Sequence, residues 1–168
     1  MPLRIDRTKR LTLDAFLVTL ALIFSYVEVL LPFFPGLPGV KLGLANLVVL
    51  IALYRLGAKD AFLINLVRIL LAGLLFAGAY GLLYSLAGGI FSFLVMVVLK
   101  NTGHFSVPGV SMAGGVAHNL AQLAVAMLMV QNVNLLFYYP VLVLSGIVTG
   151  ILIGIGAVLL SKYLHRLS

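Results

Sequence analysis

The chain has 168 residues, of which 63% are hydrophobic and 9% are charged, and its mean hydropathy is +1.23. An ordinary soluble domain is about 25% charged, so this composition excludes a soluble globular domain and a disordered chain. The absence of cysteine excludes a disulfide scaffold. A net charge of +7 would favour nucleic acid in a soluble protein, but in a membrane protein it indicates basic cytoplasmic loops, so no nucleic-acid partner is expected.

The apolar stretches predict six membrane-spanning helices in a single transmembrane domain, because each crossing takes about 20 residues. They lie at about residues 11–31, 41–56, 60–77, 80–99, 111–130 and 138–160. The first follows a basic segment, as in a signal peptide, but its apolar run is longer than the usual apolar core of a signal peptide and no cleavage site follows, so we interpret it as an uncleaved helix. The second is short, and we expect it either to tilt little or to be sheltered by its neighbours.

The distribution of basic residues predicts the orientation. If the N-terminus is cytoplasmic, nine of the eleven basic residues fall in cytoplasmic segments: Arg4, Arg7, Lys9, Arg10, Arg55, Lys59, Lys100, Lys162 and Arg166. Lys41 lies in an outer loop and Arg68 lies within a span. Because cytoplasmic loops are enriched in Lys and Arg, we predict an all-α integral protein of the cell membrane with both termini cytoplasmic.

Small residues at four-residue spacing mark several of the predicted helices. The sixth span carries Gly146, Gly150 and Gly154 on one ridge, which predicts close packing within the bundle. The first span carries a looser pattern made by Ala15, Thr19 and Ala21. This second pattern is compatible with docking of a partner protein and with packing inside the bundle, and spacing alone favours packing.

Arg68 is the clearest candidate for a functional residue, because charged side chains within a membrane span are costly and rare. It lies near the middle of the third predicted span, one turn after Asn65 and on the same helix face. A guanidinium facing a cavity suits a phosphate or carboxylate ligand. The alternative is a structural role, in which Arg68 pairs with Glu28 or with backbone carbonyls.

Two further polar groups are candidates for binding. His118, Asn119 and Gln122 cluster in the fifth span, where they would hydrogen-bond a ligand or hold neighbouring helices together. Glu28, Lys41 and Asn46 flank the predicted first outer loop and would shape the mouth of a pocket. For Glu28 and Lys41 the alternative is a salt bridge at the membrane surface.

The motifs that are missing argue against catalysis. Prenyl-chain synthesis in its usual form needs clustered aspartates to bind Mg²⁺ and diphosphate, whereas the closest acids here are Asp6 and Asp14. No nucleotide-binding motif or nucleophile elbow occurs. Without cysteine or acids near the histidines, neither a metal site nor a cofactor is expected.

Three stretches resemble signatures of the Gx transporter family, which is often labelled heptaprenyl diphosphate synthase component I. They are Pro38–Asn46, Asn65–Phe76 and His118–Gln122. The resemblance extends over about Leu11–Leu160. The six-span plan is also similar to the substrate-binding S-components of energy-coupling factor transporters.

This second similarity implies a bundle with an outward-facing pocket beneath the first outer loop. It also implies that the first helices dock on a transmembrane coupling subunit driven by separate ATPases. In that docking pattern Thr19 stands in place of an alanine.

The sequence thus favours a non-enzymatic membrane protein that binds and takes up a small anionic organic substrate from outside. The main alternative is a non-catalytic membrane subunit that binds a prenyl or quinone lipid in polyprenyl diphosphate or menaquinone metabolism. A purely structural membrane subunit is a third possibility. A pocket open to the outer aqueous side would favour uptake, and a groove open to lipid would favour the lipid-binding subunit. The absence of a cavity around Arg68 would favour the structural subunit.

Overall fold

The computed structural model describes residues 7–30 and 43–166, and every regular element in these ranges is helical. In chain order the elements are α1 (Arg7–Leu30), α2 (Leu44–Arg55), α3 (Ala58–Ala72), the π-helical turn η1 (Gly73–Ala77), α4 (Gly78–Thr102), α5 (Val107–Val130), the 3₁₀ turn η2 (Val133–Tyr138) and α6 (Tyr139–Arg166).

Four helical stretches of the described chain are long and apolar enough to cross a membrane. They are Arg7–Leu30, Ala58–Thr102, Val107–Val130 and Val133–Tyr163. The prediction of an all-helical fold is therefore confirmed for the described residues, and these four stretches are consistent with an integral membrane protein. The short helix α2 differs from these stretches, because its 12 residues are about 18 Å long and the hydrocarbon core of a bilayer is about 30 Å thick.

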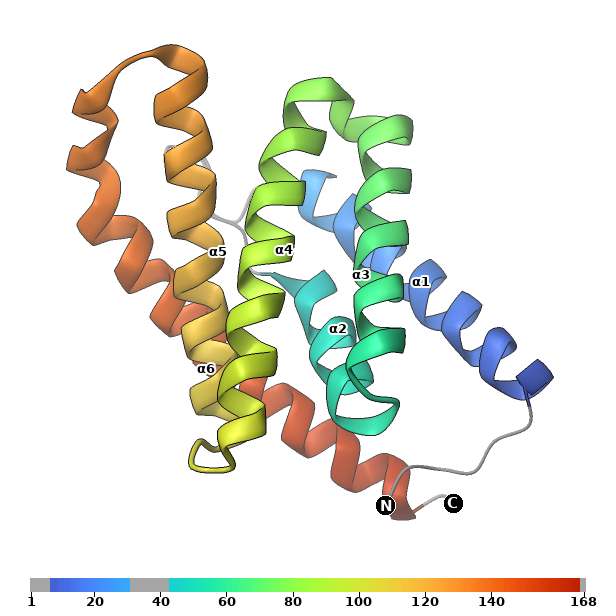
Figure 1. The fold of residues 1–168 in the computed structure, drawn as a ribbon. Coiled ribbons are helices and arrows are strands. Elements are labelled where there is room, and N and C mark those ends of the chain that lie inside the picture. The colour runs from blue at the N-terminus through green and yellow to red at the C-terminus, as the bar shows by residue number, and fades with distance from the viewer. Residues whose placement is uncertain (1–6, 31–42, 167–168) are drawn as a thin grey trace.

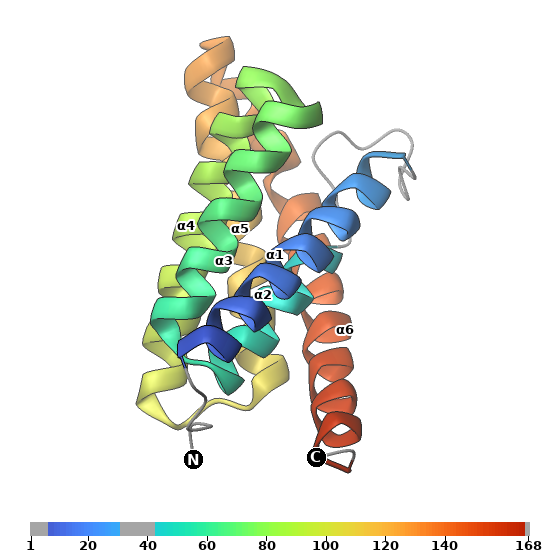
Figure 2. The same cartoon turned by 90° about the vertical axis from the view of Figure 1, so that its right-hand side faces the viewer.

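Helices α3 and α4 form one antiparallel hairpin and α5 and α6 form another, with α2 packed against α3 and α6, and α1 packed against α2 and α3 (Figure 1). The stretch Ala58–Thr102 reverses after the π-helical turn η1, at Gly78, whose φ of 68° lies in the left-handed region that favours glycine. The π turn follows α3 directly, so the predicted third span of residues 60–77 corresponds to α3 and η1 together. In the second view α1 crosses in front of α2 and α3 at a slant (Figure 2).

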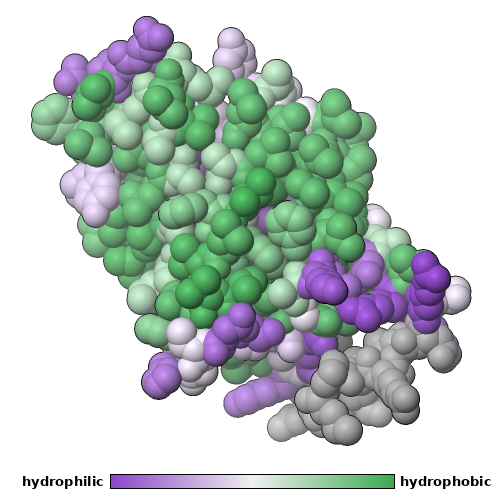
Figure 3. Space-filling view, viewed as in Figure 1, coloured by the Kyte–Doolittle hydropathy of each residue, from purple (hydrophilic) through white to green (hydrophobic). Residues whose placement is uncertain are grey.

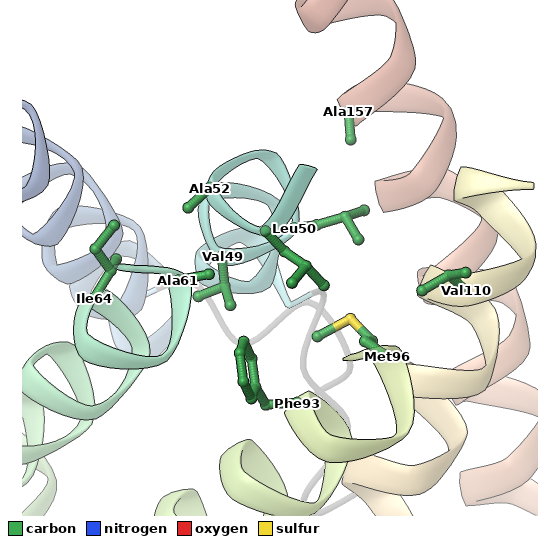
Figure 4. Packing of buried hydrophobic residues seen from close by; sticks show 10 residues of the cluster. Val49, Leu50, Ala52, Ala61, Ile64, Phe93, Met96, Val110 and Ala157 are labelled. Carbon is green, nitrogen blue, oxygen red and sulfur yellow. The ribbon is translucent and has the colours of Figure 1, made fainter. Parts of the chain in front are cut away.

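Helix α2 lies at the centre of the bundle. Of the two expectations for this short helix, little tilt or shelter by its neighbours, the structure shows shelter. Its sequence is apolar on all sides, which is typical of a buried helix. Side chains from α3, α4, α5 and α6 surround it, and Val49 and Leu50 are each only 1% exposed (Figure 4). The apolar core is therefore organised around a helix that is too short to cross a membrane alone.

The glycine ridge of α6 packs directly on the backbone of α5, as predicted. A Cβ atom at Gly150 would lie 2.6 Å from Cα of Met112, and one at Gly154 would lie 2.4 Å from Cα of Pro108. Both distances are shorter than any van der Waals contact. The two helices can therefore approach this closely only because α6 carries glycine at these positions.

Basic residues gather at one end of the bundle, which we call the basic end. Here α1 and α3 begin and α2, α4 and α6 end, and the described basic residues at these helix termini are Arg7, Lys9, Arg10, Arg55, Lys59, Lys100 and Lys162. In the space-filling view, hydrophilic side chains cluster at the two ends of the molecule and the middle is hydrophobic (Figure 3). Such a band is typical of a surface that faces lipid.

Polar contacts tie the helices together at the basic end. Arg10 forms an ion pair with Asp60, with 2.5 Å between Nη2 and Oδ2, which joins α1 to the first turn of α3. Arg55 donates to the carbonyl oxygen of Ser161 at 2.6 Å, and Lys100 donates to that of Leu53 at 2.5 Å. Both bonds place a cation beside carbonyls near the end of a helix, which is favourable for the helix dipole.

Several helices are longer than predicted. Helix α5 begins at Val107 rather than at residue 111, because Ser106 caps it by accepting a hydrogen bond from the Gly109 N–H and Pro108 occupies the first turn. Helix α4 continues to Thr102 and ends at Gly103, and α6 continues to Arg166. These extensions lie mostly at the basic end.

We expect Gly150→Ala to destabilise the protein by about 1–3 kcal/mol, because the added methyl group meets backbone atoms of α5 that cannot rotate away. The matched control is Gly156→Ala on the same helix, where the nearest atom to a new Cβ is Leu47 Cδ1 at 3.7 Å. Thermal unfolding in detergent measures both. Equal stability of the two variants would contradict the close packing of α5 on α6.

Candidate functional site

The helices enclose a cavity of about 70 Å³ in the half of the bundle away from the basic end. All six α-helices contribute to its lining. Six of the eight predicted binding residues line it: Glu28, Asn46, Arg68, His118, Asn119 and Gln122. A water molecule occupies about 30 Å³ in the liquid, so the cavity has room for a compact polar group.

Arg68 is the only lysine or arginine side chain that the described structure places in this cavity, and it is 8% exposed. Its Nη2 donates to Asn65 Oδ1 at 2.6 Å and its Nη1 donates to Ser25 Oγ at 3.3 Å. Both acceptors are neutral. Within residues 7–30 and 43–166, Arg68 Nε is buried and lacks a hydrogen-bond partner.

No carboxylate of the described chain lies within ion-pair distance of Arg68. Arg10–Asp60 is the single salt bridge of these residues. Glu28 also faces the cavity and interacts electrostatically with Arg68 from a longer distance. The direct Arg68–Glu28 pair considered from the sequence is therefore not formed, and the guanidinium retains its capacity to bind an anion.

Asn65 supports Arg68 rather than lining the cavity. Its Oδ1 accepts the short bond from Arg68, and its Nδ2 donates to the carbonyl oxygen of Gly89 on α4 at 3.1 Å. The glycine at position 89 makes room for the neighbouring Ile69 side chain, because a Cβ there would lie 2.4 Å from Ile69 Cδ1, whereas it would lie 3.4 Å from Asn65 Nδ2. The amide thus fixes the guanidinium in position relative to α4, which agrees with the predicted shared face of Asn65 and Arg68.

His118 and Gln122 lie against the backbone of α4. A Cβ atom at Gly88 would lie 2.8 Å from His118 Cε1 and 3.0 Å from Gln122 Cγ. Glycine at position 88 therefore makes room for both side chains, one turn apart on α5, beside the cavity. The pair Gly88-Gly89 was not among the predicted site residues, although adjacent glycines within an apolar span are a recognisable signal of close helix approach.

Asn119 lines the cavity and also connects α5 to α6. Its Nδ2 donates to the carbonyl oxygen of Leu142 at 2.8 Å and to Ser145 Oγ at 3.1 Å. Helix–helix bonding, one of the two roles considered for this polar cluster, is therefore observed for Asn119, which also faces the cavity.

Glu28 caps the N-terminus of α2. Its Oε1 accepts hydrogen bonds from the backbone N–H groups of Gly43 and Leu44, the second at 2.9 Å. Gly43, at φ 77°, provides no side-chain cap, so the carboxylate of α1 satisfies donors that would otherwise be orphaned. A negative charge at this position also matches the positive end of the α2 dipole. Lys41, the predicted partner of Glu28, lies outside the described residues.

Hydroxyl groups complete the polar lining and were missed by the sequence analysis. They belong to Ser25, Ser85, Ser92, Ser111 and Thr149. A hydroxyl in a helix often bonds its own backbone, as Thr149 does to the Ser145 carbonyl at 2.8 Å, so sequence alone gives no sign that it faces a cavity.

The residues predicted to dock a partner do not share one face of α1. Ala15 and Thr19 are exposed, and the Thr19 hydroxyl donates to the Ala15 carbonyl at 2.9 Å. Ala21 is completely buried and packs within the bundle. Any docking surface on α1 in this structure therefore involves Ala15 and Thr19 without Ala21.

We expect Glu28→Gln to lower thermal stability, and Glu28→Ala to lower it further. Gln keeps an acceptor for the α2 N–H groups but loses the charge that favours the helix dipole, a contribution of up to about 2 kcal/mol in partly buried positions. Alanine removes both contributions and leaves the N–H groups unpaired. Unfolding temperatures equal to that of the parent protein would show that Glu28 does not stabilise α2.

A protein-family model described as heptaprenyl diphosphate synthase component I matches residues 17–160 of the chain, which includes every described residue of the cavity. No curated protein and no solved structure matches the chain significantly.

Proposed function

The chain belongs to the heptaprenyl diphosphate synthase component I family, and we propose that it is a non-catalytic membrane protein that binds a small anionic organic substrate from outside and serves its uptake. We place it in the cell membrane, with six helices arranged as in an S-component. The short helix α2 is sheltered by the other five.

The observation that carries this proposal is the environment of Arg68 in the cavity. Arg68 is buried, faces the cavity and has only neutral hydrogen-bond partners among the described residues, while the carboxylate of Glu28 in the same lining caps α2. The Arg68 Nε has no hydrogen-bond partner in the described chain. A planar guanidinium suits carboxylate and phosphate geometry, and the hydroxyls of Ser92 and Ser111 in the same lining suit the remaining oxygen atoms of such a group.

The position of the cavity supports access from outside. Apart from Arg68, the described Lys and Arg residues lie at the basic end, and basic segments remain cytoplasmic. The cavity lies in the other half of the bundle, where Tyr80 of α4 is 72% exposed and fits an interfacial aromatic belt. This orientation puts both termini in the cytoplasm and the cavity on the outer side.

Uptake would require an energy-providing partner, because the chain contains no nucleotide-binding motif. The family description names a component, which agrees with a partner subunit. We propose a transmembrane coupling subunit with ATPases as this partner. The exposed Ala15–Thr19 face of α1 is the candidate docking surface, since small residues allow two helices to approach closely.

The family description also favours the second candidate function, a non-catalytic membrane subunit that binds a prenyl or quinone lipid. The two functions differ in the ligand retained by the protein. An uptake protein would hold a water-soluble acid at Arg68, whereas the alternative requires a long apolar chain within the bundle or at its lipid-facing side.

We expect opposite labelling of cysteines placed at the two ends of the bundle. The chain has no cysteine of its own, so Phe137→Cys in η2 and Asn101→Cys near the end of α4 each provide a single exposed thiol. In intact cells an impermeant thiol reagent should label position 137 and leave position 101 unlabelled until the membrane is opened. The reverse pattern would overturn the proposed orientation.

We expect Arg68→Lys to weaken anion binding by about tenfold or more, because lysine keeps the charge but loses the bidentate geometry. Arg68→Gln should abolish binding and leave the fold intact, since a charge within a span costs about 2.5–3.5 kcal/mol on insertion scales. Ligand-induced thermal shifts with inorganic phosphate and simple carboxylates, compared with neutral amides, measure binding and stability together.

Asn65→Asp and Lys59→Gln complete this series. The first substitution would give the guanidinium an internal carboxylate and should weaken anion binding, whereas Lys59 is exposed far from the cavity and its replacement should change nothing. Arg68 would have a structural role if Arg68→Gln failed to fold and the anion-induced thermal shift of Arg68→Lys equalled that of the parent protein.

A further inference from the structure

A second concavity lies at the basic end, between α2 and α6, on the opposite half of the bundle from the Arg68 cavity. It has a volume of about 630 Å³ and is lined by residues of α2, α6 and the first turn of α5. Its wall is apolar where Leu50, Ile51 and Val158 lie, and it ends at Arg55 and Lys162. We call it the lateral groove.

On both helices that line the lateral groove, apolar residues come first and a basic residue follows closer to the basic end. On α2 the apolar residues Leu50 and Ile51 precede Arg55, and on α6 the residues Ala157 and Val158 precede Lys162. Both helices run toward the basic end, so the apolar part lies at the depth of the hydrocarbon and the cations lie at the interface. This is the order of a lipid molecule, with its chain in the bilayer and its headgroup at the surface.

The two cations of the lateral groove have no acidic partner in the described chain. Among the residues that the structure describes, Arg55 bonds only the carbonyl oxygen of Ser161, which leaves its remaining N–H groups for a ligand, and Lys162 is exposed. The acids of the described chain lie on α1 and at the start of α3, and none of them lines the groove. The groove therefore offers two positive charges to an anion.

We propose that the lateral groove binds an anionic phospholipid of the adjacent leaflet, with its phosphate at Arg55 and Lys162 and one acyl chain along Ile51 and Val158. Basic pockets between membrane helices at this depth recognise anionic headgroups. The site is separate from the Arg68 cavity and independent of the proposed substrate. A lipid bound there would connect α2 to α6 at the basic end, where the hydrogen bond from Arg55 to the Ser161 carbonyl already joins them.

The test uses the full chain reconstituted with equal amounts of phosphatidylglycerol and phosphatidylcholine, and native mass spectrometry of the lipids that remain bound. The parent protein should retain phosphatidylglycerol preferentially. Lys162→Gln should weaken this retention about fivefold, the expected loss for one basic residue at an anionic surface, and Arg55→Gln should act in the same direction. Lys59→Gln, a charge at the same end but outside the groove, should have no effect.

Several outcomes would overturn the proposal. Equal retention of the two lipids, or equal effects of Lys59→Gln and Lys162→Gln, would show that the groove does not select the headgroup. Displacement of the lipid by glycerol phosphate at similar concentration would show that no acyl chain lies in the groove, and a lipid-free dimer would show that a second copy fills it. Phosphate-induced thermal shifts should be unchanged in Lys162→Gln, which separates this test from that of the Arg68 cavity.

Discussion

Arg68 holds a positive charge between helices whose buried side chains are mostly apolar, and the surrounding structure is built to accommodate it. Its hydrogen bonds to Asn65 and Ser25 are of a kind that contributes about 1.5–3 kcal/mol each when one partner is charged. That is comparable to the roughly 2.5–3.5 kcal/mol cost of placing arginine in a membrane span. The fold therefore accommodates the charge without a carboxylate in direct contact, and an incoming anion adds an interaction that the fold does not itself require.

Close helix packing places the polar groups around this charge. Asn65 bonds the backbone of α4 at Gly89, where the absence of a side chain makes room for Ile69, and Gly88 lets His118 and Gln122 lie against the same helix. The short helix α2 begins inside the bundle, so its N-terminal N–H groups face the cavity region and are satisfied by Glu28. Close packing at glycines and the N-terminus of α2 inside the bundle thus bring polar groups from all six helices to the Arg68 cavity.

The sequence predicted the all-helical fold well, because long apolar stretches follow directly from the requirements of a bilayer. It also singled out Arg68, since a charge within a span is conspicuous, and the structure places this residue in the cavity. Helix ends were less predictable: Ser106 and Pro108 extend α5 by four residues through a cap that the apolar pattern hides. Asn65 was selected for its position beside Arg68, but its role as a bridge to α4 depends on a tertiary contact.

Other parts of the site were beyond sequence reasoning for similar reasons. The cavity hydroxyls, such as Ser92 and Ser111, resemble any small residue of a membrane helix until neighbouring helices are placed. Of the three small residues of α1 considered for docking, Ala15, Thr19 and Ala21, only Ala21 faces the bundle, because the slant of α1 determines which side is covered. The unpaired cations of the lateral groove likewise become visible only when α2 and α6 are seen side by side.

The most direct test of the central claim is native mass spectrometry of the protein gently purified from its own membrane, with the parent chain and Arg68→Gln prepared in parallel. The account predicts a retained small molecule that carries a carboxylate or phosphate in the parent protein and its absence from Arg68→Gln. Retention of a neutral or cationic molecule, or of the same molecule by both proteins, would contradict the assignment of Arg68 as the anion-binding residue.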